Sequence, residues 1–128
     1  MKDEQYIKQC DCPEIQDAWE PRVGDWTDKG MVCHIADNNL NNIIIRTRAS
    51  ESLYGRAIYQ KKDLTWLPTQ EQLQGMLGYP LGGLVTTFCE WLDDVTFPVG
   101  EIRTMNQLWL AFVMHELHGK KWDGKEWV

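Results

Sequence analysis

The spacing of the apolar residues changes near residue 67, and this change most strongly limits what the chain can fold into. Before it, apolar and polar side chains alternate in short runs: "MVCHIA" (31–36), "IIIRTR" (43–48), "RAIYQ" (56–60) and "LTWL" (64–67). A period of two is typical of strands with one buried face. Turn-forming residues separate the runs, most densely in "DNNLNN" (37–42). The pattern predicts an antiparallel β-meander over about residues 22–67.

After residue 67, apolar side chains recur every three or four residues, which is the spacing of helices with one buried face. We expect a first helix between Thr69 and Gly78, a second over about residues 84–93 and a third over about Met105–His118. Two of these helices are introduced by a capping box: Thr69 with Gln72, and Thr104 with Gln107. Gly119 suits the end of the third helix.

The last nine residues, "KKWDGKEWV" (120–128), have the pattern of a β-hairpin. Asp123 and Gly124 stand between two strand-like pieces, and Asp-Gly favours a two-residue type I′ loop. In that register Trp122 faces Lys125, and Trp122 and Trp127 lie diagonally on one face. The complete prediction is an α+β fold with an antiparallel meander, then three helices and a C-terminal β-hairpin.

The length of 128 residues predicts one domain over residues 1–128. Residues 1–12 read as a polar lead-in that could be flexible, followed by a short helix in "PEIQDAW" (13–19) with Pro13 at its first position. No apolar run approaches the ~20 residues of a membrane span, and the polar N-terminus does not resemble a signal peptide. We therefore expect a cytoplasmic protein with no membrane partner, whose four cysteines are thiols.

The charge balance argues against a nucleic-acid-binding surface. The chain has 19 acidic and 13 basic residues and a net charge of −6, which opposes direct contact with phosphates and suits a basic partner. Eight acids, among them Glu14 and Asp17, lie between Asp3 and Asp28. They form either a solvated acidic face or a surface that imitates a nucleic-acid backbone. Arg46 and Arg48 share one strand face, where they either bind an anion or neutralise this acidic surface.

The segment "MHELHG" (114–119) is close to a zinc-protease signature. In that signature two histidines stand four residues apart on a helix, with a glutamate as the base, whereas His115 and His118 are three apart. A helix places them about 60° apart on one polar stripe. Glu116 falls in the apolar arc and is expected to point away from both, so it needs a partner, a raised pKa or access to solvent. We predict no catalytic residues and no cofactor, and His115 and His118 remain only as a disfavoured metal site.

Seven tryptophans are many for this length. Most should be buried, and one or two exposed indoles would mark an interface or stack against a ligand. Trp122 and Trp127 are the candidates. This leaves open an alternative function, a binder of a small molecule or nucleotide with a tryptophan-lined pocket.

Three segments, residues 13–26, 66–77 and 103–128, resemble small uncharacterised proteins encoded by phages and prophages of Gram-positive bacteria. The resemblance covers less than half of the chain and contains no catalytic signature. It implies a phage context, in which small acidic proteins commonly act by occupying another macromolecule. We therefore expect a non-catalytic interaction protein that binds a host or phage protein, one version being inhibition of a host nuclease or defence complex. The less favoured reading is a metal-binding enzyme centred on His115 and His118.

Overall fold

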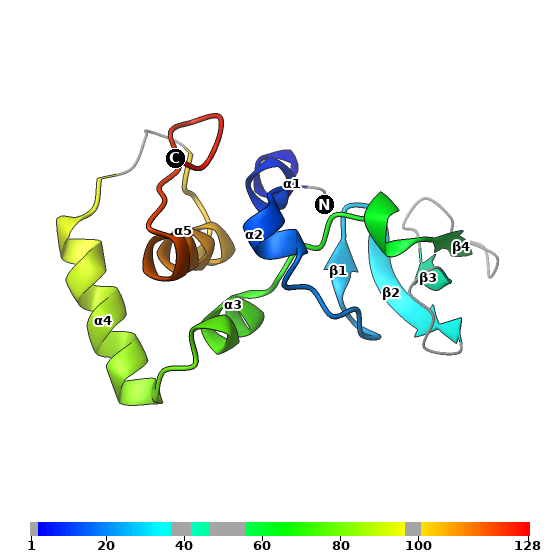
Figure 1. Ribbon diagram of the computed structural model, residues 1–128, viewed down its shortest axis with the longest axis horizontal. Helices are drawn as coiled ribbons and strands as arrows, with labels where there is room; N and C mark the ends of the chain where they lie inside the picture. Colours follow the sequence, from blue (N-terminus) through cyan, green and yellow to red (C-terminus); the bar gives the residue numbers. More distant parts are fainter. Residues whose placement is uncertain (1–2, 37–41, 47–55, 97–100) are drawn as a thin grey trace. The chain divides into compact units, whose positions relative to one another are not determined.

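The computed structural model describes residues 3–36, 42–46, 56–96 and 101–128 (Figure 1). The chain divides into two compact units, Met1–Leu67 and Pro68–Val128. The predicted α+β class is confirmed, with N-terminal helices, a four-stranded antiparallel meander and then further helices. The single domain predicted over residues 1–128 stays a prediction.

The first unit opens with two short helices. Helix α1 (Glu4–Cys10) lies within the predicted lead-in, and the Asp3 carboxylate starts it by accepting a hydrogen bond of 3.0 Å from the Tyr6 amide. Helix α2 (Pro13–Gln16) follows, with proline in its first turn as predicted. Residues 1–12 therefore supply core side chains, because Tyr6, Gln9 and Cys10 are buried.

The sheet follows the predicted meander. Its strands stand in chain order and each pairs antiparallel with the next. They are β1 (Trp26–Thr27), β2 (Gly30–Ile35), β3 (Ile43–Arg46) and β4 (Arg56–Tyr59). The strand predicted at 64–67 is reduced to an isolated bridge between Trp66 and Thr27, after a 3₁₀ turn, η2 (Lys61–Asp63).

A β-bulge in β2 changes which side chains face inward. The alternation predicted Met31, Cys33 and Ile35 on one face, yet Val32 is the fully buried residue. The register with β3 shifts between Val32 and His34, so that Val32 pairs with Ile45 and Ile35 pairs with Ile43. Both partners are fully buried. A bulge adds one residue to one strand. The inward-facing residue is therefore Val32 before the bulge and Ile35 after it.

The side-chain amide of Gln16 ties the start of the first unit to its end. Its Nε2 donates to the carbonyl oxygens of Cys10 (2.9 Å) and Trp66 (3.0 Å), and its Oε1 accepts from the Trp66 amide (2.8 Å). The Trp66 ring is stacked on Trp19 with planes 8° apart. The Trp19 indole N–H donates to the buried Asp25 carboxylate at 2.9 Å.

The second unit contains the three predicted helices, α3 (Gln70–Leu77), α4 (Leu81–Asp94) and α5 (Met105–His118). Both predicted capping boxes form, and Gly119 ends α5 in the left-handed conformation. Helix α4 begins three residues earlier than expected, because Gly82 and Gly83, which suggest a break, are tolerated in its first turn. Helix α5 is buried on several sides, with all six residues from Trp109 to Met114 in the core.

The predicted C-terminal hairpin is wrong. No strands form there, and the chain reverses with one isolated bridge between Trp122 and Trp127. The loop therefore has four residues instead of two. The Asp123 carboxylate accepts hydrogen bonds of 2.8 Å from the amides of both Lys125 and Glu126. These local bonds compete with the type I′ loop, because a short acidic side chain can cap its own turn.

Substitution of Gly30 tests how much its close contact with β3 contributes to the stability of the sheet. It has φ +138°, and an added Cβ would overlap the carbonyl oxygen of Arg46. We expect Gly30→Ala to lower the free energy of unfolding by about 1–3 kcal/mol, through strain in this close approach. Urea denaturation followed by tryptophan fluorescence measures it. Gly75→Ala is the control: this exposed residue of α3 has open space around its Cα, and the change should stabilise by about 0.5–1 kcal/mol. Equal effects of both changes would contradict the close approach.

The Asp123 turn predicts acid sensitivity at the C-terminus. Hydrogen bonds from the Glu126 and Lys125 amides hold the pKa of Asp123 below its ordinary value of 3.8. A carboxyl whose pKa falls on folding stabilises the turn above pH 3.8, and this contribution is lost as pH falls through the lowered pKa. We expect the amide signals of residues 125 and 126 to shift in this window in NMR spectra. In the Asp123→Asn variant, the amide signals of residues 125 and 126 should not change with pH in this window. If they still titrate as in the unaltered protein, the effect belongs to another group.

Candidate functional site

Helix α4 is attached to α5 by aromatic rings along one edge of its apolar face. The Phe88 ring stacks on Trp109 with centroids 3.9 Å apart and planes 9° apart, and it meets Phe112 edge-on at 5.2 Å. Trp91 adds a tilted contact of 5.1 Å with Phe112. Leu84 and Phe88 are buried by this packing. The contact leaves the two flanks of α4 available for other roles.

One flank is an exposed apolar surface that we call the α4 strip. It consists of Leu81, Val85 and Leu92, whose exposed fractions are 77%, 51% and 39%. At about 100° per residue these three positions fall within roughly 40° of one another on the helix. The charges of α4 are Glu90, Asp93 and Asp94, and the helix has no lysine or arginine. The α4 strip is therefore an apolar surface on a purely acidic helix.

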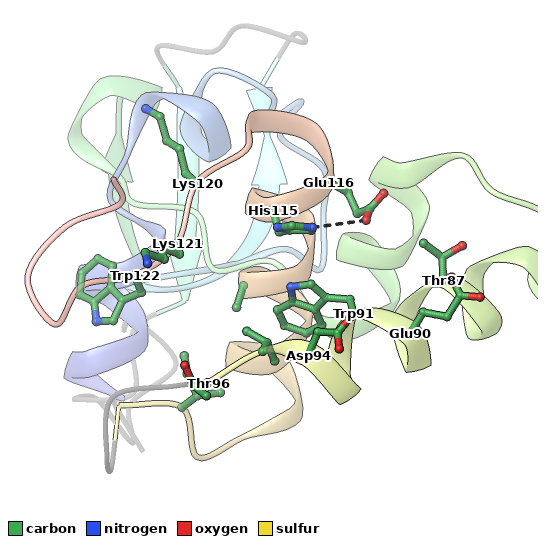
Figure 2. A pocket seen from close by; sticks show the side chains of 13 residues that line it. Thr87, Glu90, Trp91, Asp94, Thr96, His115, Glu116, Lys120, Lys121 and Trp122 are labelled. Atoms are coloured by element: carbon green, nitrogen blue, oxygen red, sulfur yellow. Dashed lines mark ion pairs between the residues drawn. The ribbon is translucent and has the colours of Figure 1, made fainter.

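The other flank of α4 borders a cavity of about 390 Å³ that we call the unit-2 pocket (Figure 2). Helix α4 contributes acids and an aromatic ring, α5 contributes two polar side chains, and the segment after α5 contributes lysines and a second indole. These lining residues are Glu90, Trp91 and Asp94, then His115 and Glu116, and then Lys120, Lys121 and Trp122. The pocket thus combines aromatic side chains with charges of both signs.

Glu116 does not point away from the histidines as the helical wheel predicts. Its Oε1 lies 3.9 Å from His115 Nε2, and its Oε2 accepts a hydrogen bond of 2.7 Å from the Tyr79 hydroxyl. The Glu116 side chain is only 19% exposed. A carboxylate with so little access to water needs polar partners, and Tyr79 and His115 provide them. The hydrogen bond to Glu116 also raises the pKa of the Tyr79 hydroxyl above its ordinary value of 10.0.

The two histidines are not brought together around a ligand set. His115 lines the unit-2 pocket, whereas His118 is exposed and does not. Within residues 3–36, 42–46, 56–96 and 101–128, no group of three or more His, Cys, Asp or Glu side chains could hold a metal ion. Instead, Glu116 accepts a hydrogen bond from Tyr79 and lies 3.9 Å from His115.

Cys10 is buried at the end of α1, and the half-buried Cys12 caps the start of α2. Burial raises the pKa of Cys12 to about 11 and raises the pKa of Cys10 well above its usual value. The thiolate is the nucleophile and the metal ligand, and at neutral pH both groups are therefore protonated and unsuited to either role. Cys33 is half-buried and Cys89 is exposed on α4.

The predicted binding residues are spread over both units. Arg46 is exposed and pairs across the sheet with Arg56, while Arg48 lies outside the described residues. Asp17 is exposed and borders a second cavity of about 500 Å³ that also contacts Lys61 and Lys62. The half-buried Glu14 does not line that cavity.

Trp122 and Trp127, the two candidate binding tryptophans, pack against each other. Their ring centroids are 5.1 Å apart in an edge-on arrangement, and Trp122 is only 6% exposed. Its indole N–H donates to Glu101 at 3.4 Å. The α4 strip is the feature that sequence reasoning missed. The strip includes Leu81, which lies before the start at residue 84 that the sequence predicts for this helix.

No protein-family model, curated protein or solved structure matches this chain. Among the described residues, no helix has the length and apolar character required to cross a membrane.

The contact between Tyr79 and Glu116 can be tested by titration. Because a hydrogen-bonded carboxylate raises the pKa of the Tyr79 hydroxyl, we expect Glu116→Gln to lower that pKa toward 10.0. NMR of ring-labelled tyrosine, with the signal assigned through Tyr79→Phe, follows the titration. Glu90→Gln removes an acid of the same unit and is the matched control. An equal change in both variants would indicate a general charge effect in place of the hydrogen bond.

Proposed function

We propose that the protein is a small, phage-encoded, non-catalytic interaction module that binds a host or phage protein through the α4 strip. The observation that carries this proposal is the exposure of Leu81, Val85 and Leu92 on one flank of a helix whose remaining apolar side chains are packed against α5. Contiguous apolar surfaces on small proteins mark sites of interaction. In this proposal, the protein acts in the cytoplasm of the bacterial host.

The energy available from the strip is substantial. Complete burial of one leucine or valine side chain contributes about 1.5–3 kcal/mol, and these three are 39–77% exposed. Covering them would contribute on the order of 3–5 kcal/mol, which alone corresponds to about millimolar affinity. Contacts beyond the strip must therefore supply the remaining affinity and the choice of partner.

The acidic charge of the chain defines the chemistry of the partner. Asp93 is the acid of α4 that lies nearest to the strip, whereas Glu90 and Asp94 line the unit-2 pocket on the other flank, and the whole chain has a net charge of −6. A complementary surface is an apolar groove bordered by lysine and arginine side chains, since opposite charges at a rim accelerate association and exclude wrong partners. Enzymes that act on nucleic acids carry basic surfaces, so a host nuclease or the nucleic-acid-binding part of a defence complex fits this description.

The metal-enzyme alternative has weaker support. His115 borders the unit-2 pocket without His118. The neighbouring carboxylate of Glu116 is engaged by the Tyr79 hydroxyl at 2.7 Å. A metal site needs three or four convergent ligands, and this geometry offers a carboxylate and one imidazole.

A binding experiment in which a charge is introduced into the strip tests the proposal. Full-length protein is used to isolate a stoichiometric partner from a lysate of a Gram-positive bacterium, and the affinity of the purified pair is then measured by calorimetry. We expect Val85→Glu to weaken binding by about tenfold or more, equal to about 1.4 kcal/mol, because it places a charge inside an apolar contact. Raised salt should weaken binding as well, because charged rims are screened.

Val23→Glu is the matched control, because Val23 is 64% exposed but belongs to the first unit. It should leave the affinity unchanged. If no stoichiometric partner is recovered, or if Val85→Glu binds as tightly as the unaltered protein, the α4 strip is not the docking surface. Circular dichroism of each variant excludes unfolding as the cause of lost binding.

A further inference from the structure

We propose that the outer edge of β4 binds an extended segment of a partner protein by strand addition. The segment runs antiparallel to β4 and places an apolar side chain beside Ile58 and, two residues later, an acidic side chain beside Arg56. This site belongs to the first unit. It goes beyond the proposed function, which uses the α4 strip of the second unit.

Only one of the two edges of the sheet is covered by the described part of the chain. At the β1 edge, the Leu67 amide donates to the Trp26 carbonyl (2.8 Å) and the Asp28 amide donates to the Thr65 carbonyl (3.0 Å). At the opposite edge β4 stands last in the strand order (Figure 1), and among the described residues its backbone bonds to β3 alone. The strand β4 is therefore an open edge.

An open edge strand offers unused backbone groups to another chain. In an antiparallel pair, alternate residues bond to the neighbouring strand, and the residues between them point outward. Two of the four residues of β4 (Arg56–Tyr59) therefore direct an amide and a carbonyl away from β3. At about 3.4 Å per residue, this edge fits a segment of roughly four to six residues. Extended peptides bind such edges through main-chain hydrogen bonds, and their alternate side chains give specificity.

The exposed face of β4 gives this edge an apolar position and a basic position. Ile58 is 67% exposed, and the exposed Arg56 lies two residues away on the same face. Edge strands of soluble proteins are usually protected from other chains by charged side chains, proline or bulges. The strand β4 has no proline, and its register with β3 has no shift. Its isoleucine is therefore available to an added strand.

Two arginines define the charge of the segment that fits this edge. Arg56 stands directly opposite Arg46 on β3, both side chains are exposed, and like charges in this position repel. Neither arginine forms an ion pair with another described residue. The four strands contain no acidic residue, although the chain has 19. An acidic side chain beside Arg56 would offset the repulsion between the arginines.

The order of the two positions fixes the sequence pattern of the segment. In an antiparallel addition, the residue opposite Ile58 comes first and the residue opposite Arg56 comes two residues later. Side chains branched at Cβ pack well on a pleated surface. The expected pattern is therefore valine or isoleucine, then any residue, then aspartate or glutamate. A nucleic-acid strand lacks the amides that pair with this edge, and the net charge of −6 opposes a long polyanion.

NMR titration of the full-length protein with a synthetic peptide tests the proposal. The probe is the blocked hexapeptide Thr-Val-Thr-Glu-Thr-Thr, in which valine and glutamate stand two residues apart. We expect the amide signals of β4 to shift with a Kd below about 1 mM. Replacing the glutamate of the peptide by lysine should weaken binding by about tenfold or more, because it places a third positive charge beside the two arginines.

Two methylated peptides separate strand addition from attraction between charges. One carries N-methyl groups on its even-numbered amides and the other on its odd-numbered amides, so that each loses the donors of one edge only. In strand addition, one of the two should bind about tenfold or more weakly and the other like the unmodified peptide. Both measurements use the unaltered protein and therefore do not depend on how a variant folds.

The matching change in the protein is Arg56→Glu. It should weaken peptide binding by about tenfold or more without destabilising the sheet, because it replaces the repulsion from Arg46 by attraction. Arg22→Glu is the control: it reverses another exposed arginine of the first unit, before β1, and should leave the affinity unchanged. Val85→Glu alters the α4 strip and should also leave peptide binding unchanged, so that failure of this inference and failure of the proposed function are distinguishable.

Three results would overturn the proposal: no shift of β4 signals with peptide at about 1 mM, equal binding of the two methylated peptides, or no effect of Arg56→Glu. A protein dimer in analytical ultracentrifugation that Ile58→Glu dissociates would assign the edge to a second copy of the chain. Tighter binding of a single-stranded oligonucleotide than of the peptide would assign this face to nucleic acid. Either of these two results would equally overturn it.

Discussion

The stacking of Phe88 on Trp109 is the contact on which both flanks of α4 depend. The two rings lie 3.9 Å apart and nearly parallel, and Phe112 and Trp91 complete the cluster. Aromatic pairs of this kind contribute about 0.5–1.5 kcal/mol beyond the area that they bury. Because large rings join the helices along one edge, the contact leaves an apolar strip uncovered on one side of α4 and space for a pocket on the other.

The first unit is held together by a different kind of contact, in which single polar side chains reach across the sequence. Gln16 bonds to the backbone of Trp66 from 50 residues away. The Asp28 carboxylate similarly accepts a bond of 2.9 Å from the Thr65 amide. Buried backbone groups need such partners. These side chains therefore add to the two backbone bonds of this segment, from the Asp28 amide to the Thr65 carbonyl (3.0 Å) and from the Leu67 amide to the Trp26 carbonyl (2.8 Å).

What the sequence predicted correctly depends on local interactions. The capping boxes at Thr69 and Thr104 form because their partners are three residues away. The bulge at Cys33 could not be predicted, because it depends on the register with β3. The position of Glu116 was also missed, since a helical wheel gives the direction of Cβ while the carboxylate reaches His115 through its own rotamer. The α4 strip could not be predicted without knowing how little of α4 is covered by α5.

Several residues of α4 lower the stability of the second unit, so stability alone does not explain their presence. Asp93 and Asp94 stand at its C-terminal end, where each negative charge opposes the helix dipole by about 0.3–1 kcal/mol at low ionic strength. Pro80 at its start provides no side-chain cap, and Leu81 remains 77% exposed. These features each cost stability in the isolated unit. A basic, apolar partner would bury the strip and meet Asp93 beside it, whereas Asp94 lines the unit-2 pocket on the other flank of the helix.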